Sequence, residues 1–324
     1  MHTKLLPILL LGSGLMLAPG SASAAQVTVV ESYDASLGQL PEGVAVSPRG
    51  DIYVTLAGSG ELRRLDRKTY AGSTLAQFDV GFGFLLGMAF DDDDLYVVLA
   101  SFVEETSGVW KVEPDGTKQR VVAFGANEFP NDITFDGEGN MYVTESIGGA
   151  VYKIAPGSSE RELWVQDPAL VGDVLVSPVP FPIGANGITY DDETSSLLVA
   201  NSQVPALIEI DDDDGVAGDL WIVAAGEHLR GADGIALDQH GDVVLVSNFN
   251  SAVLHVDRCS GATTTIADAS DGLVFPSTVA FGRHGKDKKS IFVANFGFGA
   301  GPDAPVSILK IALGIKGEDI PAGK

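Results

Sequence analysis

One short pattern of polar and apolar positions recurs six times along the chain. In each copy a head residue and a small or polar residue precede a hydrophobic, small, hydrophobic triplet, as in Asp233-Gly234-Ile235-Ala236-Leu237. The heads are Glu42, Leu86, Asn131, Asn186, Asp233 and Ser277, spaced 44, 45, 55, 47 and 44 residues apart. Alternation of this kind predicts a short β-strand, and its recurrence at a near-constant period indicates a repeat architecture.

Most of these units divide into four short strands. The first unit predicts strands at 44–47, 52–55, 62–65 and 74–78, and the third at 133–135, 141–144, 151–154 and 162–165. Four strands in about 45 residues is typical of a propeller blade, so six units predict an all-β, six-bladed β-propeller. The sixth unit has no fourth strand of its own, and we expect the apolar run at 27–30 to complete it. Such closure removes exposed strand edges.

The start of the chain has the pattern of an export signal. Lys4 precedes an apolar run at 5–17, and Ala22-Ser23-Ala24 is typical of a cleavage site. We therefore predict a signal peptide at 1–24, a single propeller domain at 25–324 that ends in a polar tail, and export to the periplasm or the medium. No later segment approaches the roughly 20 apolar residues of a membrane helix.

Composition narrows the classes of partner. A net charge of -24 argues against binding to nucleic acid or an anionic membrane surface. It suits a protein that recruits cations, and it suits a solvated acidic surface equally well. The acidic runs at 91–94 and 211–214 are interpreted as hairpin turns rather than calcium loops. Cys259 is the single cysteine, which excludes an internal disulfide. We expect a monomer that acts on a small molecule.

The heads carry the candidate chemistry. In a propeller the first strand of each blade lines the central channel, so equivalent residues at its start form a ring. Four heads, Glu42, Asn131, Asn186 and Asp233, offer carboxylate or amide oxygens. These hard ligands suit calcium, with magnesium or manganese as alternatives, and are poor ligands for zinc. The competing interpretation is that these residues only cap the turns before each strand.

These motifs resemble those of the gluconolactonase and senescence-marker-protein (regucalcin) family of six-bladed propellers. The resemblance rests on Pro41-Glu42-Gly43, Ala185-Asn186-Gly187 and Ala232-Asp233-Gly234, whose heads match the divalent-metal ligands of that family. Asn131 in Pro130-Asn131-Asp132 matches the remaining ring asparagine, which is a metal ligand or a substrate contact depending on the member. The resemblance implies a metal-dependent hydrolase.

The mouth of the channel departs from the sugar lactonases of that family. They carry an arginine two residues before the ring asparagine, where this chain has Phe129. Other phenylalanines lie near segments that enter or leave the channel, and about half are expected there rather than in the core: Phe82, Phe84, Phe181, Phe249, Phe296 and Phe298. The proline-rich stretch 167–183 is expected to form a loop over the mouth. An apolar ester or lactone is therefore favoured over a sugar lactone.

Two functions follow from these patterns. The first is a divalent-metal-dependent hydrolase of a lactone or ester, with Asp233 as general base or nucleophile and with Asn131, Phe129, His228 and Arg230 contacting the substrate. The alternative is a non-catalytic propeller with a structural metal that binds a ligand or a protein partner. The sequence contains no Gly-x-Ser-x-Gly elbow that would indicate a serine hydrolase.

Overall fold

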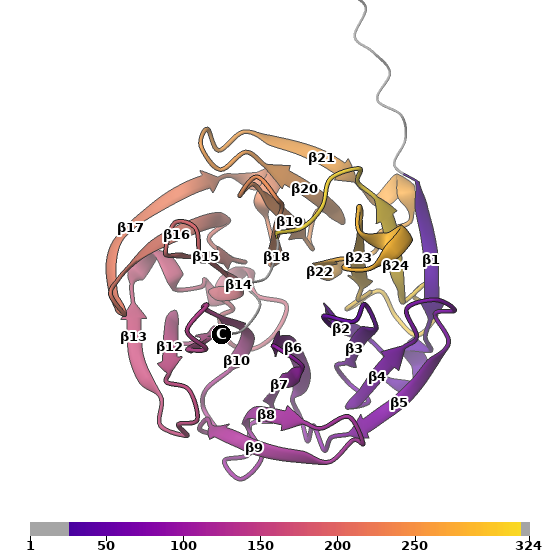
Figure 1. Ribbon diagram of the computed structural model, residues 1–324, viewed down its shortest axis with the longest axis horizontal. Coiled ribbons are helices and arrows are strands. Elements are labelled where there is room, and N and C mark those ends of the chain that lie inside the picture. The colour runs from indigo at the N-terminus through magenta and orange to yellow at the C-terminus, as the bar shows by residue number, and fades with distance from the viewer. Residues whose placement is uncertain (1–25, 319–324) are drawn as a thin grey trace, which may run out of the picture.

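Six four-stranded antiparallel sheets surround a central axis, and the predicted six-bladed β-propeller is confirmed (Figure 1). The structure is a computed structural model that describes residues 26–318, so the predicted signal peptide lies outside the described residues. No helix within 26–318 combines the length and apolar character needed to cross a membrane.

The blades follow one another along the chain. The first two consist of β2 (Pro41–Val46), β3 (Ile52–Leu56), β4 (Glu61–Leu65) and β5 (Gly72–Gln77), then β6 (Phe84–Asp91), β7 (Asp94–Ala100), β8 (Gly108–Val112) and β9 (Lys118–Ala123). The third and fourth consist of β10 (Pro130–Phe135), β11 (Met141–Glu145), β12 (Ala150–Ile154) and β13 (Glu162–Gln166), then β14 (Ala185–Asp191), β15 (Ser196–Asn201), β16 (Ala206–Asp213) and β17 (Val216–Ala225). The fifth consists of β18 (Ala232–Leu237), β19 (Val243–Ser247), β20 (Ala252–Val256) and β21 (Thr263–Ala267).

The last blade combines both ends of the described chain. It contains β22 (Pro276–Phe281), β23 (Ser290–Asn295), β24 (Ser307–Ala312) and, as its outermost strand, β1 (Val27–Ser32). β1 pairs antiparallel with β24, so that Val27 lies opposite Ile311. The N-terminal strand is thus the fourth strand of this sheet.

The hydrophobic core lies between the blades. The second strand of each blade is buried on both faces because each sheet packs against a neighbouring sheet on either side. Val54, Val97, Val143, Val199 and Val293 are 0% exposed. Burial on both faces explains why the second strands show little polar alternation in the sequence.

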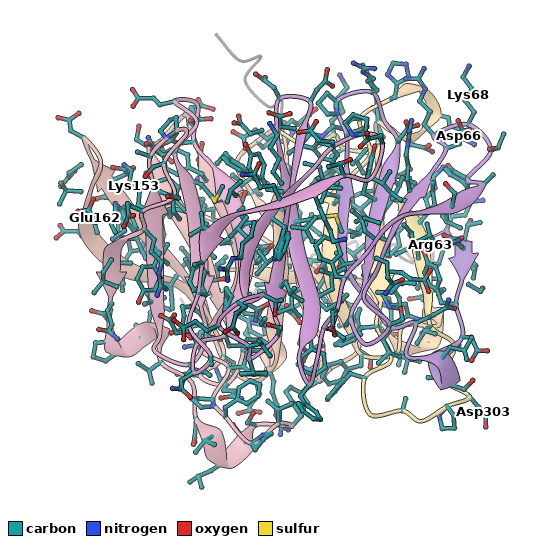
Figure 2. All side chains as sticks on the ribbon, turned by 90° about the horizontal axis from the view of Figure 1, so that it is seen from below. Arg63, Asp66, Lys68, Lys153, Glu162 and Asp303 are labelled. Atoms are coloured by element: carbon teal, nitrogen blue, oxygen red, sulfur yellow. The ribbon has the colours of Figure 1, made fainter. Side chains whose placement is uncertain are left out.

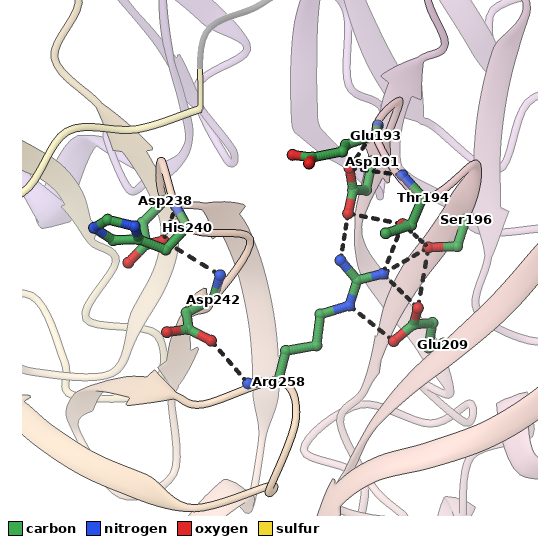
Figure 3. A network of polar contacts seen from close by, with 9 residues as sticks. All are labelled: Asp191, Glu193, Thr194, Ser196, Glu209, Asp238, His240, Asp242 and Arg258. Atoms are coloured by element: carbon green, nitrogen blue, oxygen red, sulfur yellow. Dashed lines mark hydrogen bonds and ion pairs between the residues drawn. The ribbon is translucent and has the colours of Figure 1, made fainter.

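Arg258 ties the fourth and fifth blades together. It follows β20, and its guanidinium reaches across to the fourth blade (Figure 3). There it contacts Asp191, and its Nε donates to Glu209 Oε2 at 2.9 Å. Nη2 also donates to Ser196 Oγ at 2.7 Å. Both carboxylates are buried, so this network replaces part of the apolar contact between the two blades.

After β24 the chain crosses one face of the propeller toward β18 (Figure 1). Gly317 forms an isolated β-bridge with Asp238, and the backbone N–H of Glu318 donates to the carbonyl of Leu237 at 3.0 Å. The described part of the predicted polar tail therefore packs on the ends of the inner strands that lie opposite the heads.

Candidate functional site

All six inner strands begin with the same local irregularity. The pairing of each inner strand with its neighbour shifts register, as at a β-bulge, directly around the head. The shifts lie between Pro41 and Val44, Leu85 and Met88, Pro130 and Ile133, Ala185 and Ile188, Ala232 and Ile235, and Pro276 and Val279. A bulge redirects a side chain out of the alternation of the strand, so the repeated pattern places six heads equivalently around the axis.

Glycine follows four of the heads because neighbouring inner strands approach closely there. A Cβ at Gly187 would lie 2.2 Å from the carbonyl oxygen of Asp233, and one at Gly234 would lie 2.6 Å from the Cα of Thr278. At Gly87 a Cβ would lie 2.1 Å from a carboxylate oxygen of Asp132. No larger residue fits without moving backbone or this carboxylate, so glycine determines how close the heads lie.

Hydroxyl groups fix the orientation of the two asparagine heads. Asn131 Nδ2 donates to Ser146 Oγ at 3.0 Å, and Asn186 Nδ2 donates to Ser202 Oγ at 2.8 Å. Each serine in turn donates to a carbonyl of the next inner strand. Because the amide nitrogens are engaged in this way, the side-chain oxygens are the atoms left to serve as ligands.

Three carboxylates lie near one another at the ring of heads: Glu42 and Asp233 are buried, and Asp132 is half-buried. Burial, followed by the nearby Asp233 and Asp132 carboxylates, raises the pKa of Glu42 well above its ordinary value. Burial likewise raises the pKa of Asp233 well above its ordinary value, against the lowering effect of a hydrogen bond from Asn248 Nδ2 at 3.0 Å. Burial raises the pKa of Asp132 to about 7. Among the described residues, no lysine, arginine or histidine lines the pocket beside Glu42 and Asp233.

This arrangement fits a divalent cation. The Oε2 atom of Glu42 is buried and has no hydrogen-bond partner among the described residues, and the same holds for Asn248 Oδ1. Both atoms are acceptors, and the four heads supply only oxygen ligands. Clustered acceptors and carboxylates in a site without lysine or arginine are stabilised by a hard cation such as calcium.

The heads open onto a pocket of about 590 Å³, part of which is open to solvent. Its lining consists of the four oxygen-bearing heads, several polar side chains and many aromatic or aliphatic ones: Glu42, Phe84, Leu86, Phe129, Asn131, Pro178, Val179, Phe181, Ile183, Asn186, Ser202, Gln203, Asp233, Asn248, Phe249, Phe275, Phe296 and Phe298. The last residues of the loop at 167–183 line the pocket at its mouth, as expected. In the side view, this loop lies on the same face of the propeller as the labelled Asp303 (Figure 2).

The structure brings most of the predicted site residues together, with clear exceptions. Glu42, Asn131, Asn186, Asp233 and Phe129 all line the pocket. The remaining two predicted substrate contacts do not: His228 and Arg230 are exposed. The short 3-10 helix η4 (Glu227–Leu229) precedes β18, and the Arg230 guanidinium lies over the ring of Phe249, 5.2 Å from its centroid. Closeness to Asp233 in sequence therefore did not place them in the site.

The predicted aromatic mouth is largely present. Phe84, Phe181, Phe249, Phe296 and Phe298 line the pocket, whereas Phe82 is 98% exposed and does not.

Sequence reasoning missed Asp132, Gln203, Asn248 and Phe275. Asp132 could have been recognised from the sequence, since it occupies a position that is glycine in four other repeats. The other three lie in turns or loops between strands, where no periodic pattern marks them.

A second group of potential ligand atoms lies away from this pocket. One atom each of Asp238, Asp242 and His255 lies within 4.8 Å of the others. Asp238 Oδ1 already accepts from the backbone N–H of His240 at 2.8 Å, and Oδ2 lies 3.1 Å from His255 Nε2. Hydrogen bonds within the turn and to His255 of β20 account for this cluster.

Known proteins resemble this chain in sequence and in fold. No family model matches the chain. The diisopropyl-fluorophosphatase of Loligo vulgaris is 25% identical over 240 residues, which cover 66% of this chain and 74% of that protein.

Solved structures share the fold over nearly the whole chain. A calcium-binding regucalcin from Agrobacterium tumefaciens superposes with a TM-score of 0.69 at 14% identity, covering 93% of this chain and 97% of its own. A gluconolactonase from Xanthomonas campestris superposes with a TM-score of 0.66 at 16% identity, covering 89% and 90%. The structural neighbours of the chain are thus regucalcin and gluconolactonase propellers, which confirms the resemblance predicted from the ring motifs.

Proposed function

We propose that the protein is a divalent-metal-dependent hydrolase of a lactone or ester, acting at the mouth of the central channel. The observation that carries this proposal is the set of four oxygen-bearing heads around a pocket in which a buried oxygen of Glu42 has no partner among the described residues. Two similar proteins are named for hydrolysis, a gluconolactonase and a diisopropyl-fluorophosphatase. Calcium is the preferred ion, because the ligands are hard oxygens and the similar regucalcin is calcium-binding.

A cation held by Glu42, Asn131, Asn186 and Asp233 would polarise a substrate oxygen and stabilise the negative charge that develops on it. Asp233 is the proposed general base or nucleophile, since it is the carboxylate head that a second side chain positions. Asn248 Nδ2 donates to Asp233 Oδ2 and thereby fixes the orientation of the carboxylate. The phenylalanines of the lining keep bulk water away from the reacting groups.

The test is an assay of the purified protein on a panel of lactones and aryl esters, with and without chelator. Asp233→Asn is compared with Asp219→Asn, which makes the same change at an exposed position of β17. We expect turnover that chelator abolishes, that Asp233→Asn lowers by at least about a hundredfold, and that Asp219→Asn leaves unchanged. Turnover that survives both chelator and Asp233→Asn would refute the proposed mechanism.

The alternative function is a non-catalytic propeller with a structural metal. It is favoured by one observation: no histidine or lysine is among the described residues that line the pocket, so a carboxylate is the only titratable group available there. Under this alternative, chelator lowers the thermal stability while no member of the panel is turned over. Lack of bound metal in the purified protein would contradict both functions.

We further propose that the protein is exported and acts as a monomer. The proposal rests on the signal pattern at 1–24, which lies outside the described residues. Cell fractionation and N-terminal sequencing test it, with a mature terminus near residue 25 as the expected result. Light scattering tests the monomer.

A further inference from the structure

The mouth of the pocket is walled by a continuous series of phenylalanine rings. Neighbouring ring centroids lie 4.9 Å apart for Phe181 and Phe129, 6.2 Å for Phe129 and Phe84, and 6.2 Å for Phe84 and Phe298. The series continues to Phe275 at 6.0 Å and from there to Phe249 at 5.3 Å. We call these six residues the aromatic collar. Five of them lie in loops and Phe84 begins β6, so the collar is built from several blades and surrounds much of the mouth.

The turn between β15 and β16 contributes no ring to the collar and supplies Gln203 instead. This side chain is 8% exposed and lines the pocket. Its Oε1 accepts from the backbone N–H of Ile183 at 2.9 Å, which determines which end of the amide is oxygen. The Nε2 atom is buried and has no hydrogen-bond partner among the described residues.

A buried N–H group without a partner is destabilising, and a ligand oxygen that accepts a hydrogen bond from it removes that cost. Glu42 Oε2 and Asn248 Oδ1, the other unpartnered polar atoms of the lining, are acceptors and fit a cation. Gln203 Nε2 is the single donor among them, so it fits an oxygen of the substrate. Its position is fixed at both ends, because its backbone N–H also donates to Asn201 Oδ1 at 3.1 Å.

The charge of the lining defines the rest of the substrate. Glu42 and Asp233 are its only charged members among the described residues, so no basic group is present to bind a carboxylate, sulfate or phosphate. With a cation at the heads, their negative charge is largely neutralised, and the collar presents mainly apolar surface. The rings of the collar match an aryl group or a medium-length acyl chain in polarity.

We propose that the site takes an uncharged aryl or medium-chain acyl ester or lactone, whose apolar part lies within the aromatic collar and whose ester group accepts a hydrogen bond from Gln203 Nε2. This inference rests on the proposed function for its reaction and adds the substrate class and a substrate-binding residue. Gln203 contacts the substrate directly and takes no proton in the reaction.

The experiment measures binding of N-(4-nitrophenyl)butanamide, a stable amide analogue of 4-nitrophenyl butyrate, to the calcium-loaded protein by calorimetry. Gln203→Glu retains an oxygen for the Ile183 N–H and removes the donor, so we expect about tenfold weaker binding. The matched control Gln119→Glu makes the same charge change at an exposed position of β9 and is expected to stay within twofold. Phe298→Ala removes one ring of the collar and is expected to weaken binding about fivefold.

Binding by Gln203→Glu within twofold of the unsubstituted protein overturns the role of Gln203, provided that its thermal unfolding is unchanged. Tighter binding of a trimethylammonium or a carboxylate analogue than of the neutral amide overturns the substrate class. The two proposals fail separately. Amide binding without turnover of 4-nitrophenyl butyrate contradicts the hydrolase, and turnover of gluconolactone without amide binding contradicts the substrate class.

Discussion

Replacing Arg258 by methionine tests how the closed ring of blades is held together. The guanidinium spans the fourth and fifth blades and engages Asp191 and Glu209, whose side chains are 4% and 8% exposed (Figure 3). Methionine retains much of the side-chain volume and the backbone N–H that donates to Asp242 at 3.0 Å. The substitution therefore removes the charge while leaving two buried carboxylates in place.

The loss of one partner of a buried ion pair costs about 3 to 5 kcal/mol because the remaining charge stays desolvated. For a propeller of this length that corresponds to a decrease in Tm of about 5 to 8 °C, measured by calorimetry or circular dichroism. Arg49→Met is the matched control. Arg49 also reaches from one blade to the next, but its ion pair with Asp93 is 74% and 64% exposed, so its loss is expected to cost less than about 1 kcal/mol.

The difference in stability also depends on pH. Burial raises the pKa of Asp191, but hydrogen bonds from Arg258 and Thr194 more than reverse this, so its pKa is lowered overall. The contribution of the pair is complete above the unfolded pKa of about 4 and is lost as the pH falls through the lower folded value. The destabilisation by Arg258→Met is therefore expected to be constant from about pH 6 to 8 and to shrink in acid. A loss of under 1 kcal/mol at pH 7, equal to that of Arg49→Met, would refute this reasoning.

Three further predictions concern the inner strands, the bound ion and the tail. Gly187→Ala places a Cβ against the Asp233 backbone, so Tm is expected to fall by several degrees. Calcium affinity, measured by titration, is expected to fall with it. An unchanged calcium affinity would contradict the role of the close approach of the strands. Chelation is expected to lower Tm by about 4 °C if calcium was present at a hundred times its Kd, whereas an unchanged Tm excludes a bound ion. Burial raises the pKa of Glu318 to about 7, so the folded form holds its proton longer than the unfolded one and stability falls as pH rises from about 4.5 to 7. The stability of Glu318→Gln minus that of the unsubstituted protein is therefore expected to be greater at pH 8 than at pH 5, by about 1 kcal/mol after allowance for solvent screening. An equal difference at both pH values rules this out.

The blades and the ring of heads could be predicted because both depend on local patterns. Each inner strand carries a head residue, which glycine follows in four of the six repeats, and then an alternating triplet. In the structure this pattern forms the same bulge in all six blades. The prediction that Glu42, Asn131, Asn186 and Asp233 lie around one channel needed only the equivalence of the repeats. That they line one pocket follows from the symmetry of the fold.

The loops could not be predicted in the same way, because nothing periodic determines where their side chains point. Phe275 has a φ of 44°, which a hydrophobic pattern does not reveal, and it lies in the collar. Gln203 faces the pocket because Asn201 and Ile183 fix it from two directions. His228 lies five residues before Asp233 in the chain, yet a single 3-10 turn leaves it exposed.

The two halves of the site therefore have different physical origins. The spacing of the heads depends on backbone packing, since a Cβ at Gly43 would lie 2.6 Å from the Leu86 carbonyl and one at Gly187 would lie 2.2 Å from that of Asp233. Side-chain changes elsewhere leave that spacing unaltered, so a propeller with these glycines retains the ring. The aromatic collar depends on loops, which tolerate change at little cost to the fold. The fold that this chain shares with a gluconolactonase is thus compatible with a different substrate, and Phe129 and Gln203 are the positions at which we propose that the substrate is distinguished.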